Sequence, residues 1–348
     1  MGGGEHAARA APLPRHAGGA RQVPPSSQSQ PCTPVTRYLA RRLGASLVTA
    51  LLASLLVFLI VRQVPGDVVA QMLGQTSDPV AEQAMRRFFG IDEPLWLQYG
   101  KWIAAVLTGD LGTSFVRGSS VAGMVKDAFL VTLEIGLLTL LVSTAIGVPL
   151  GVLAGRHEGR WPDRLVQSFS LIGLSAPVFW IGLMLLVGVS TWIGWSPPFT
   201  YTPPWSSLSD NLEILVLPIL SLGLLQSAAY AQFVRQSVVS AYHQDYVRTA
   251  IAKGLPMRIV FFKHILRNIL IPLLTFVGLI LIQILGGVVV VESLFAIPGL
   301  GRLLLTAIET RDYPLLQGAL LVVVVVAMVV NLTVDLLYRV IDPRVRMG

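Results

Sequence analysis

Two long stretches without a charged side chain limit what this chain can fold into. No Asp, Glu, Lys or Arg occurs from Leu165 to Ser209 or from Asn268 to Val291. Soluble domains carry about 25% charged residues, whereas only 13% of these 348 residues are charged and 53% are hydrophobic. A lipid bilayer accommodates such stretches, because a helix crosses it with about 20 apolar residues. The composition therefore excludes an ordinary water-soluble globular protein.

The apolar stretches predict helices rather than the strands of a membrane barrel. Barrel strands alternate apolar and polar residues, whereas these runs are continuous, and a helix satisfies its own backbone hydrogen bonds in lipid. Pro149, Pro177, Pro218 and Pro272 lie in or near the runs, where neighbouring helices tolerate the kinks that proline causes. We predict an all-α membrane protein with six transmembrane helices, at about residues 43–64, 128–154, 165–193, 214–234, 269–291 and 315–337.

The distribution of positive charge predicts the orientation of these helices. Most of the 26 lysines and arginines fall in the N-terminal tail, in two alternate loops and at the C-terminus. Short loops rich in Lys and Arg stay in the cytoplasm, so we expect both termini to be cytoplasmic. The charges lie between apolar runs and not on a basic face, which favours a membrane lipid surface over nucleic acid. Residues 1–36 have the composition of a disordered cytoplasmic tail, and residues 37–348 form the transmembrane domain.

Two connections are too long to be simple loops. Residues 65–127 form an external loop with amphipathic segments, and residues 235–267 form a cytoplasmic loop that is strongly basic around a single acid, Asp245. Loops longer than about 12–15 residues are usually functional or disordered. The pattern of the cytoplasmic loop is that of an ordered, functional segment.

The cytoplasmic loop has the signals of two short helices. Asp245 can cap the start of the first helix, Gly254 can end it in a left-handed conformation, and Pro256 suits the first turn of the second. Helical spacing places four apolar residues on one face, namely Tyr246, Val247, Ala250 and Ile251. We therefore predict two short cytoplasmic helices bent at Gly254.

This loop could serve either of two partners. Its basic residues, among them Arg248 and Lys253, could bind anionic lipid headgroups. Alternatively, the small residues Ala250 and Ala252 would let the first helix lie closely in a groove of a partner protein. The residues alone leave both possibilities open.

The loop also resembles a known motif. Residues 245–254 read DYVRTAIAKG, followed by HILRN at 264–268 and IP at 271–272. This resembles the EAA loop of ABC-importer permeases, in particular the "B" permease subunit of the dipeptide/oligopeptide/nickel branch. Arg248 and Thr249 stand where the general motif has Glu and its first Ala. The resemblance covers about residues 35–346 and includes further segments, at residues 90–96, 109–112, 175–180, 298–302, 311–314 and 342–344.

The resemblance implies a non-catalytic subunit of an ATP-driven importer in the bacterial plasma (inner) membrane. Two homologous permeases would pair, as a heterodimer, two cytoplasmic ATPases would bind their loops, and an external binding protein would deliver di- or oligopeptides. A nickel chelate, haem or another small solute is the alternative cargo. The chain has no G-x-x-x-x-G-K-[ST] motif, so ATP and Mg²⁺ would bind the partner ATPase and this chain would hold no cofactor. The residues expected to couple to the ATPase are Asp245, Tyr246, Val247, Arg248, Thr249, Ala250, Ala252, Lys253 and Gly254.

A few polar residues in or beside the predicted helices are candidates for the solute pathway. Glu134 would lie about 9 Å inside the second helix at 1.5 Å per residue, where a carboxylate needs a partner or water. Glu292 precedes a Pro-Gly turn that could form an external gate. Each side chain could equally be structural, because interhelical hydrogen bonds are common in membrane bundles. The candidates are Glu134, Ser175, Gln283, Glu292 and Asn331.

Two other classes of membrane protein fit less well. A transporter driven by an ion gradient would usually show several intramembrane ionisable residues or an inverted repeat, and we find only Glu134 and Asp335. We interpret Asp335 as the partner of Arg339, four residues along the helix. An intramembrane enzyme would need a catalytic constellation, yet no histidine falls at membrane depth. We therefore predict no catalytic and no metal-binding residues.

Overall fold

The computed structural model describes residues 35–63, 79–88 and 92–341. The predicted tail, residues 1–36, lies outside the described part except for its last two residues, as does part of the predicted external loop. The described helices pack within one unit, residues 45–348, and the packing below is that of this unit. The elements are α1 Val35–Gln63, α3 Pro79–Phe88, α4 Leu95–Leu107, α5 Val121–Arg156, α6 Trp161–Ser175, α7 Val178–Gly188, a π-helical stretch Val189–Ile193, α8 Leu208–Tyr242, α9 Asp245–Ala252, α10 Met257–Ile259, a second π-helical stretch Val260–Leu266, α11 Arg267–Leu294, α12 Leu300–Glu309 and α13 Tyr313–Ile341.

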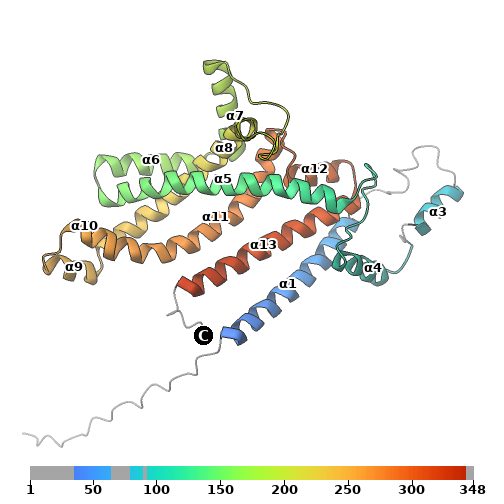
Figure 1. The fold of residues 1–348 in the computed structure, drawn as a ribbon, viewed down its shortest axis with the longest axis horizontal. Coiled ribbons are helices and arrows are strands. Elements are labelled where there is room, and N and C mark those ends of the chain that lie inside the picture. Colours follow the sequence, from blue (N-terminus) through green and yellow to red (C-terminus); the bar gives the residue numbers. More distant parts are fainter. Residues whose placement is uncertain (1–34, 64–78, 89–91, 342–348) are drawn as a thin grey trace, which may run out of the picture. The chain divides into compact units, whose positions relative to one another are not determined.

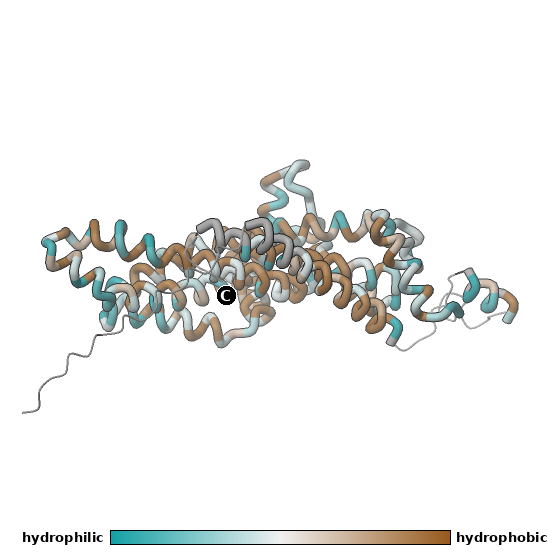
Figure 2. The backbone as a smooth tube through the Cα atoms, turned by 90° about the horizontal axis from the view of Figure 1, so that it is seen from below, coloured by the Kyte–Doolittle hydropathy of each residue, from teal (hydrophilic) through white to brown (hydrophobic). Residues whose placement is uncertain are grey.

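The described residues confirm an all-helical chain with long apolar helices, and their strand-like pairing is limited to one isolated bridge between Thr113 and Ser120. Five helices in this part of the chain are long and apolar enough to cross a membrane, or six if one bent pair is a single span. Figure 2 shows hydrophobic residues along the middle of the long helices and hydrophilic residues toward their ends.

The predicted third helix, residues 165–193, is not continuous. It divides into α6 and α7, which meet at an angle of 105°. Ala176 is extended, with φ −84° and ψ 132°, because the ring of Pro177 disfavours the helical conformation of the residue before it. Pro149, Pro218 and Pro272 instead lie inside unbroken helices. The same residue type therefore breaks one helix and leaves three intact.

Helices α5 and α8 pack closely along much of their length, and Figure 1 shows them side by side. Glycines on α5 allow this approach. A methyl group at Gly151 would lie 2.7 Å from the carbonyl oxygen of Ala231, and one at Gly155 would lie 2.6 Å from Cβ of Val238. Small residues spaced four apart bring membrane helices together in this way. The α5–α8 pair is the framework on which the other helices pack.

Two buried apolar clusters join the remaining long helices to this framework. In one, Ile135 of α5 and Leu222 of α8 pack with Ile284 of α11. In the other, Val57 of α1 and Val125 of α5 pack with Leu315 of α13. Figure 1 shows α9 and α10 at one end of the long helices and α12 at the other. We call these the α9 end and the α12 end.

Several helices extend beyond the predicted bounds. Helix α5 begins at Val121, where the backbone N–H of Val121 donates to the carbonyl of Gly112 at 3.0 Å. Helix α8 continues to Tyr242, which takes residues 235–242 out of the predicted cytoplasmic loop. The two segments at residues 79–107 that have amphipathic spacing form α3 and α4.

Candidate functional site at the α9 end

Helix α9 is held to the long helices by two small apolar side chains. Val247 and Ala250 are buried in a cluster with Val238 of α8 and with Val260 and Ile265 of the second π-helical stretch. Tyr246 and Ile251, predicted to share that apolar face, are 36% and 46% exposed. Helix α9 is therefore anchored along a narrow stripe and presents the rest of its surface outward.

The ends of α9 follow the predicted signals in part. Gly254 adopts φ +79°, and its N–H donates to the carbonyl of Ile251 at 2.9 Å, as expected for a glycine after a helix. Asp245 is the first helical residue, preceded by Gln244, and no side-chain hydrogen bond caps the helix. The predicted capping by Asp245 is therefore wrong. Its carboxylate still lies in the first turn, where a negative charge interacts favourably with the positive end of the helix dipole.

The second predicted short helix is not separate. From Met257 the chain runs as one helical segment of 38 residues to Leu294, through α10, the π-helical stretch and α11. Pro256 lies just before this segment, with φ −63° and ψ 142°. Helix α9 is consequently joined directly to two long helices, α8 on one side and this segment on the other. A displacement of α9 would act on both.

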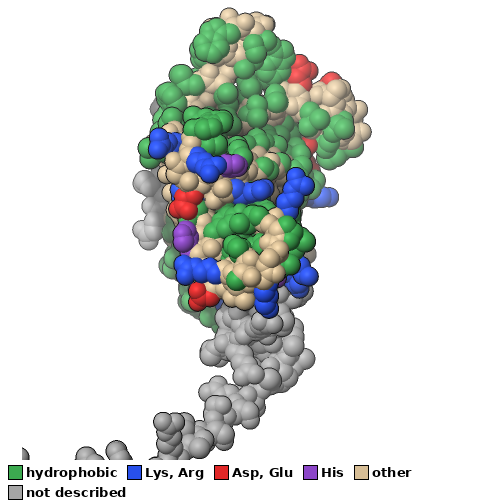
Figure 3. Space-filling view, turned by 90° about the vertical axis from the view of Figure 1, so that its left-hand side faces the viewer, with side chains coloured by type: hydrophobic (Ala, Val, Ile, Leu, Met, Phe, Trp, Pro, Cys, Tyr) green, Lys and Arg blue, Asp and Glu red, His purple; other side chains and the backbone are tan. Residues whose placement is uncertain are grey.

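The exposed surface at the α9 end combines positive charge with apolar side chains. Figure 3, viewed from this end, shows Lys and Arg side chains around a hydrophobic area. The guanidinium of Arg156, at the end of α5, lies 4.9 Å from the ring centroid of Phe261. The exposed residues on α9 and in the chain up to Lys263 are Asp245, Tyr246, Arg248, Thr249, Ile251, Ala252, Lys253, Gly254, Leu255, Pro256, Met257, Arg258, Ile259, Phe262 and Lys263.

A polar groove of about 600 Å³ opens between α6 and α8. On α6 the lining follows helical spacing, with positions 164, 167, 168, 171 and 175, and on α8 it follows 232, 235 and 236. Sequence reasoning selected only Ser175 among these residues, and its hydroxyl donates to the carbonyl of Leu171 at 2.7 Å. The lining residues are Arg164, Gln167, Ser168, Ser170, Leu171, Leu174, Ser175, Gln232, Arg235 and Gln236.

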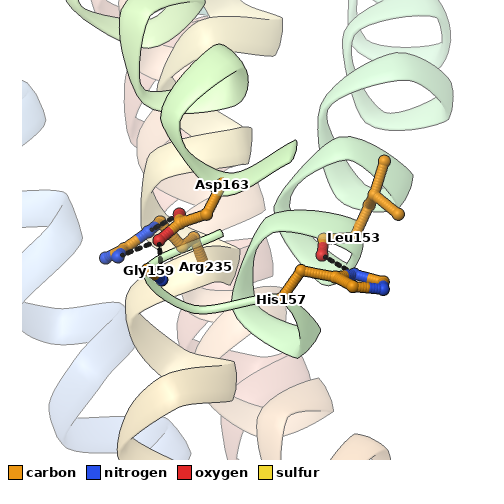
Figure 4. Close-up of polar contacts among 5 residues, drawn as sticks. All are labelled: Leu153, His157, Gly159, Asp163 and Arg235. Carbon is orange, nitrogen blue, oxygen red and sulfur yellow. Dashed lines mark hydrogen bonds and ion pairs between the residues drawn. The ribbon is translucent and has the colours of Figure 1, made fainter. Parts of the chain in front are cut away.

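An ion pair joins the two walls of this groove. The Asp163 carboxylate accepts from the Arg235 guanidinium at 2.5 and 2.8 Å, and from the backbone N–H of Gly159 at 2.8 Å. Figure 4 shows Asp163 between these partners, with the His157 ring beside the carbonyl of Leu153. Asp163 was missed in the sequence. Its signal in the sequence was an acid in the first turn of a helix, seven residues after the end of α5.

The two predicted glutamates lie away from the groove, and both accept hydrogen bonds. The Glu134 carboxylate on α5 accepts from the Tyr201 hydroxyl at 2.6 Å. Burial, followed by the contact with Glu134, raises the pKa of Tyr201 above its ordinary value, so the phenol remains a donor. Glu292 is fully buried within α11 and accepts from the Thr132 hydroxyl at 2.5 Å and from the N–H groups of Gly301 and Arg302 at 2.8 and 3.1 Å. Its carboxylate therefore binds the N-terminus of α12.

The last two predicted pathway residues are exposed on single helices. Gln283 lies on α11 and Asn331 on α13, and neither lines the groove. Asp335 lies on α13, whereas the side chain of Arg339, its predicted partner, is outside the described side chains. The structure thus brings only Ser175 of the predicted set to the groove.

Comparison with known proteins agrees with this arrangement. Residues 147–347 match the family described as the inner membrane component of binding-protein-dependent transport systems. Residues 35–136 match the N-terminal part of such membrane components. The chain belongs to this family. It is a multi-pass permease subunit of a binding-protein-dependent ABC importer, of the dipeptide/oligopeptide type.

The relatives of this permease include proteins with a named cargo. The glutathione transport system permease protein GsiC of Escherichia coli O6:H1 is 37% identical over 309 residues, which cover 89% of this chain and 98% of the relative. The protein of the same name from Salmonella paratyphi A is 37% identical, and that of Escherichia coli strain K12 is 36% identical, with the same coverage of both chains. The similarity therefore spans nearly the whole length of these relatives.

Proposed function

We propose that this permease forms half of a membrane pathway for peptide-like solutes, di- and oligopeptides included, which an external binding protein delivers. A second, homologous permease forms the other half. Two cytoplasmic ATPases, which hold ATP and Mg²⁺, bind at the α9 end and drive the movement. The subunit itself then has no catalytic role and no cofactor, and it acts in the bacterial plasma membrane.

The observation that carries this proposal is how α9 packs on the long helices. Its buried stripe consists of Val247 and Ala250 alone, while Tyr246, Arg248 and Ile251 face outward. A short helix of this kind fits the groove of a partner protein, which an apolar anchor and flanking charges recognise. Because short turns join α9 to two long helices, a partner that moves α9 would move both of them as rigid bodies.

The orientation in the proposal rests on charge. The α9 end carries the exposed cations Arg248, Lys253, Arg258 and Lys263, and the neighbouring α5–α6 turn carries Arg160. Lys and Arg near the ends of membrane helices remain on the cytoplasmic side. We infer that the α9 end and both termini face the cytoplasm and that the α12 end faces the binding protein.

The groove between α6 and α8 supports a role in passage. Apart from the buried Ser170, its glutamines and serines are exposed on two helices of the bundle. Polar side chains at membrane depth face water or another protein rather than lipid. A second permease that covers this face would convert the open groove into part of a closed, polar channel.

The named relatives and the groove support the proposed cargo. Glutathione is a tripeptide with free carboxylates, and a lining of Gln, Ser and Arg side chains offers hydrogen-bond donors and positive charge to such a solute. A nickel chelate, haem or another small solute is the alternative cargo of the same machinery. An ion-gradient-driven transporter is the remote alternative.

Reconstitution of the assembly tests the proposal. The permease would be purified with the permease, ATPase and binding protein encoded beside it and placed in liposomes. We expect uptake of radiolabelled glutathione or a labelled dipeptide that requires both ATP and the binding protein, with competition by longer peptides, nickel chelate and haem ranking the cargoes. Uptake by the isolated chain along an ion gradient, without ATP, would contradict the proposal.

A cross-linking experiment tests the α9 contact separately. A cysteine at Lys253, in a chain whose native Cys32 is replaced by serine, should capture the ATPase in intact cells. A cysteine at Lys101, on α4 and 61% exposed, is the matched control and should capture no ATPase. Equal capture at both sites would remove the reason for assigning the contact to α9.

A further inference from the structure

The ion pair between Asp163 and Arg235 has a position that packing alone does not explain. Two charged hydrogen bonds join the first turn of α6 to α8, at 2.5 and 2.8 Å, in a bidentate arrangement. The Asp163 side chain is 1% exposed and that of Arg235 is 20% exposed. The same carboxylate also accepts from Gly159, which fixes the α5–α6 turn. Three elements therefore meet at one carboxylate.

Helix α6 depends on this pair for its position. At its far end the chain turns by 105° into α7, so no continuing helix holds α6 in line. Apolar contacts also hold it: Val166 is buried with Ala154 of α5 and Ala231 of α8, and a methyl group at Gly173 would lie 2.7 Å from Cβ of Ala228. Without the ion pair, α6 would retain these apolar contacts, but they are non-directional and would let it shift against α8. The half of α6 nearest α9 is the half that the pair restrains.

Arg235 lies between α9 and the groove. It lies seven residues before the end of α8 at Tyr242, or about 10 Å at the rise of a helix, and it lines the groove itself. A displacement of α9 reaches Arg235 through α8 and reaches α6 through Asp163. The glycine contacts already hold α5 to α8, so the ion pair is not needed for that packing.

Stability is a weak explanation for this pair. Burying two charges costs about as much as their attraction returns, so apolar side chains of similar size often serve as well. What a bidentate pair adds is a fixed direction between two helices. That property matters where two helices have to move together.

We propose that the Asp163–Arg235 pair is a positioning link that makes α6 follow α8 when α9 is displaced, and that it thereby sets the width of the groove. The two residues act through the helices and not by contact with the solute. This inference rests on the proposed function, because it concerns how movement at the ATPase contact reaches the pathway.

Charge neutralisation and charge exchange test the link in the reconstituted assembly. The measured quantity is the amount of radiolabelled glutathione taken up per ATP hydrolysed. We expect Asp163→Asn and Arg235→Gln each to lower this ratio about fivefold or more, the lower range of coupling between sites, while ATP hydrolysis continues. The double variant Asp163→Arg with Arg235→Asp should recover most of the ratio. The exposed pair Glu93–Lys101, changed to Gln at both positions, is the control and should keep the wild-type ratio.

A distance measurement separates the link from a merely structural role. Spin labels at Ser168→Cys on α6 and Gln232→Cys on α8, in the Cys32→Ser background, report the separation of the two walls. We expect a narrow distance distribution in the wild type, both without nucleotide and with ATP and vanadate. Asp163→Asn should broaden it, and the charge exchange should narrow it again.

Three results would overturn the link. The first is a wild-type ratio of uptake to ATP hydrolysis in the single variants. The second is a charge-exchange variant whose ratio, in fully assembled complexes, is no higher than that of the single variants. The third is a distance distribution in Asp163→Asn that is the same as in the wild type. If a single variant does not assemble, Arg235→Lys keeps the charge but loses the bidentate geometry, and it should give an intermediate ratio. A wild-type assembly without ATP-dependent uptake would instead refute the proposed function, and the nucleotide-free distances would still test the link.

Discussion

Helices α12 and α9, at opposite ends of this permease, are held by different chemistry. At the α12 end, Glu292 and Asp312 are both buried, at 0% and 1% exposure, and each accepts several hydrogen bonds from other elements. Glu292 binds Thr132 and the start of α12, and Asp312 accepts from the Ser114 hydroxyl and the Phe115 N–H. At the α9 end, the described anchor of α9 is apolar and is followed by a glycine turn.

The difference indicates which end is fixed and which can move. A buried carboxylate that binds several donors holds them in one geometry, because each donor left unpaired would be costly. Apolar contacts are non-directional, so a helix held by them can shift and remain bound. Helix α12 is therefore suited to a constant position and helix α9 to transmitting a displacement, while the buried Asp163 fixes α6 against α8 at the α9 end.

The largest effect is expected at the fixed end. Glu292→Ala leaves three donors without their acceptor inside the protein and should lower the free energy of unfolding by about 3 kcal/mol or more. Urea unfolding in detergent micelles would measure it. Glu309→Ala, at an exposed site on the same α12, is the control and should change stability by less than about 0.5 kcal/mol. A similar loss for both variants would remove the contrast between the ends.

A change at the glycine turn should affect coupling rather than folding. Gly254 has φ +79°, which proline cannot adopt because its ring fixes φ near −65°. We expect Gly254→Pro to insert and assemble but to lose substrate-stimulated ATP hydrolysis by about tenfold or more. A methyl group at Gly254 would meet no atom within 4 Å, and asparagine tolerates this backbone conformation. Gly254→Asn should therefore keep most of the stimulation, and an equal loss in both variants would refute the role of the turn.

Sequence reasoning succeeded where a local pattern decides the structure. Long apolar runs predicted the membrane helices, and a glycine after an amphipathic segment predicted the left-handed residue at Gly254. Helical spacing placed Val247 and Ala250 on one apolar face and both are buried, but Ala250 packs inside this chain rather than being left for the groove of a partner. Each of these signals acts within a few residues, so no knowledge of the tertiary structure was required.

It failed where a distant contact decides the structure. Pro177 breaks a helix and Pro218 does not, because the outcome depends on how neighbouring helices satisfy the freed backbone groups. Glu292 reaches the start of α12 only because the chain reverses near Ala296, at φ 56°. The groove is an intermediate case. Its polar residues recur on α6 at helical spacing, a pattern that could have been recognised.

A smaller effect is expected at the contact between Tyr201 and Glu134. Tyr201→Phe removes one hydrogen bond to a carboxylate and should lower the free energy of unfolding by about 1 kcal/mol. The raised pKa of Tyr201 means that this contribution is complete below the ordinary tyrosine pKa of 10.0 and is lost as the pH rises through the higher folded value. The difference in free energy of unfolding between the wild type and Tyr201→Phe should thus be constant from pH 7 to about 9 and decrease only above that range. A stability difference that already decreases between pH 7 and about 9 would contradict a hydrogen bond donated by the neutral Tyr201 hydroxyl.

The smallest effect on the fold, yet a clear effect on assembly, is expected at the α9 surface. Arg248 is exposed, so Arg248→Glu should change stability by less than about 0.5 kcal/mol. Reversing its charge should still weaken the proposed ATPase contact a few-fold, and the difference from wild type should fall at high salt because exposed charges are screened. Titrating the detergent-solubilised permease pair with the ATPase at low and high salt would measure this. Lys101→Glu reverses a charge on α4, away from α9, and should leave the affinity unchanged. Equal weakening by both substitutions would show that net charge, and not the α9 surface, governs the contact.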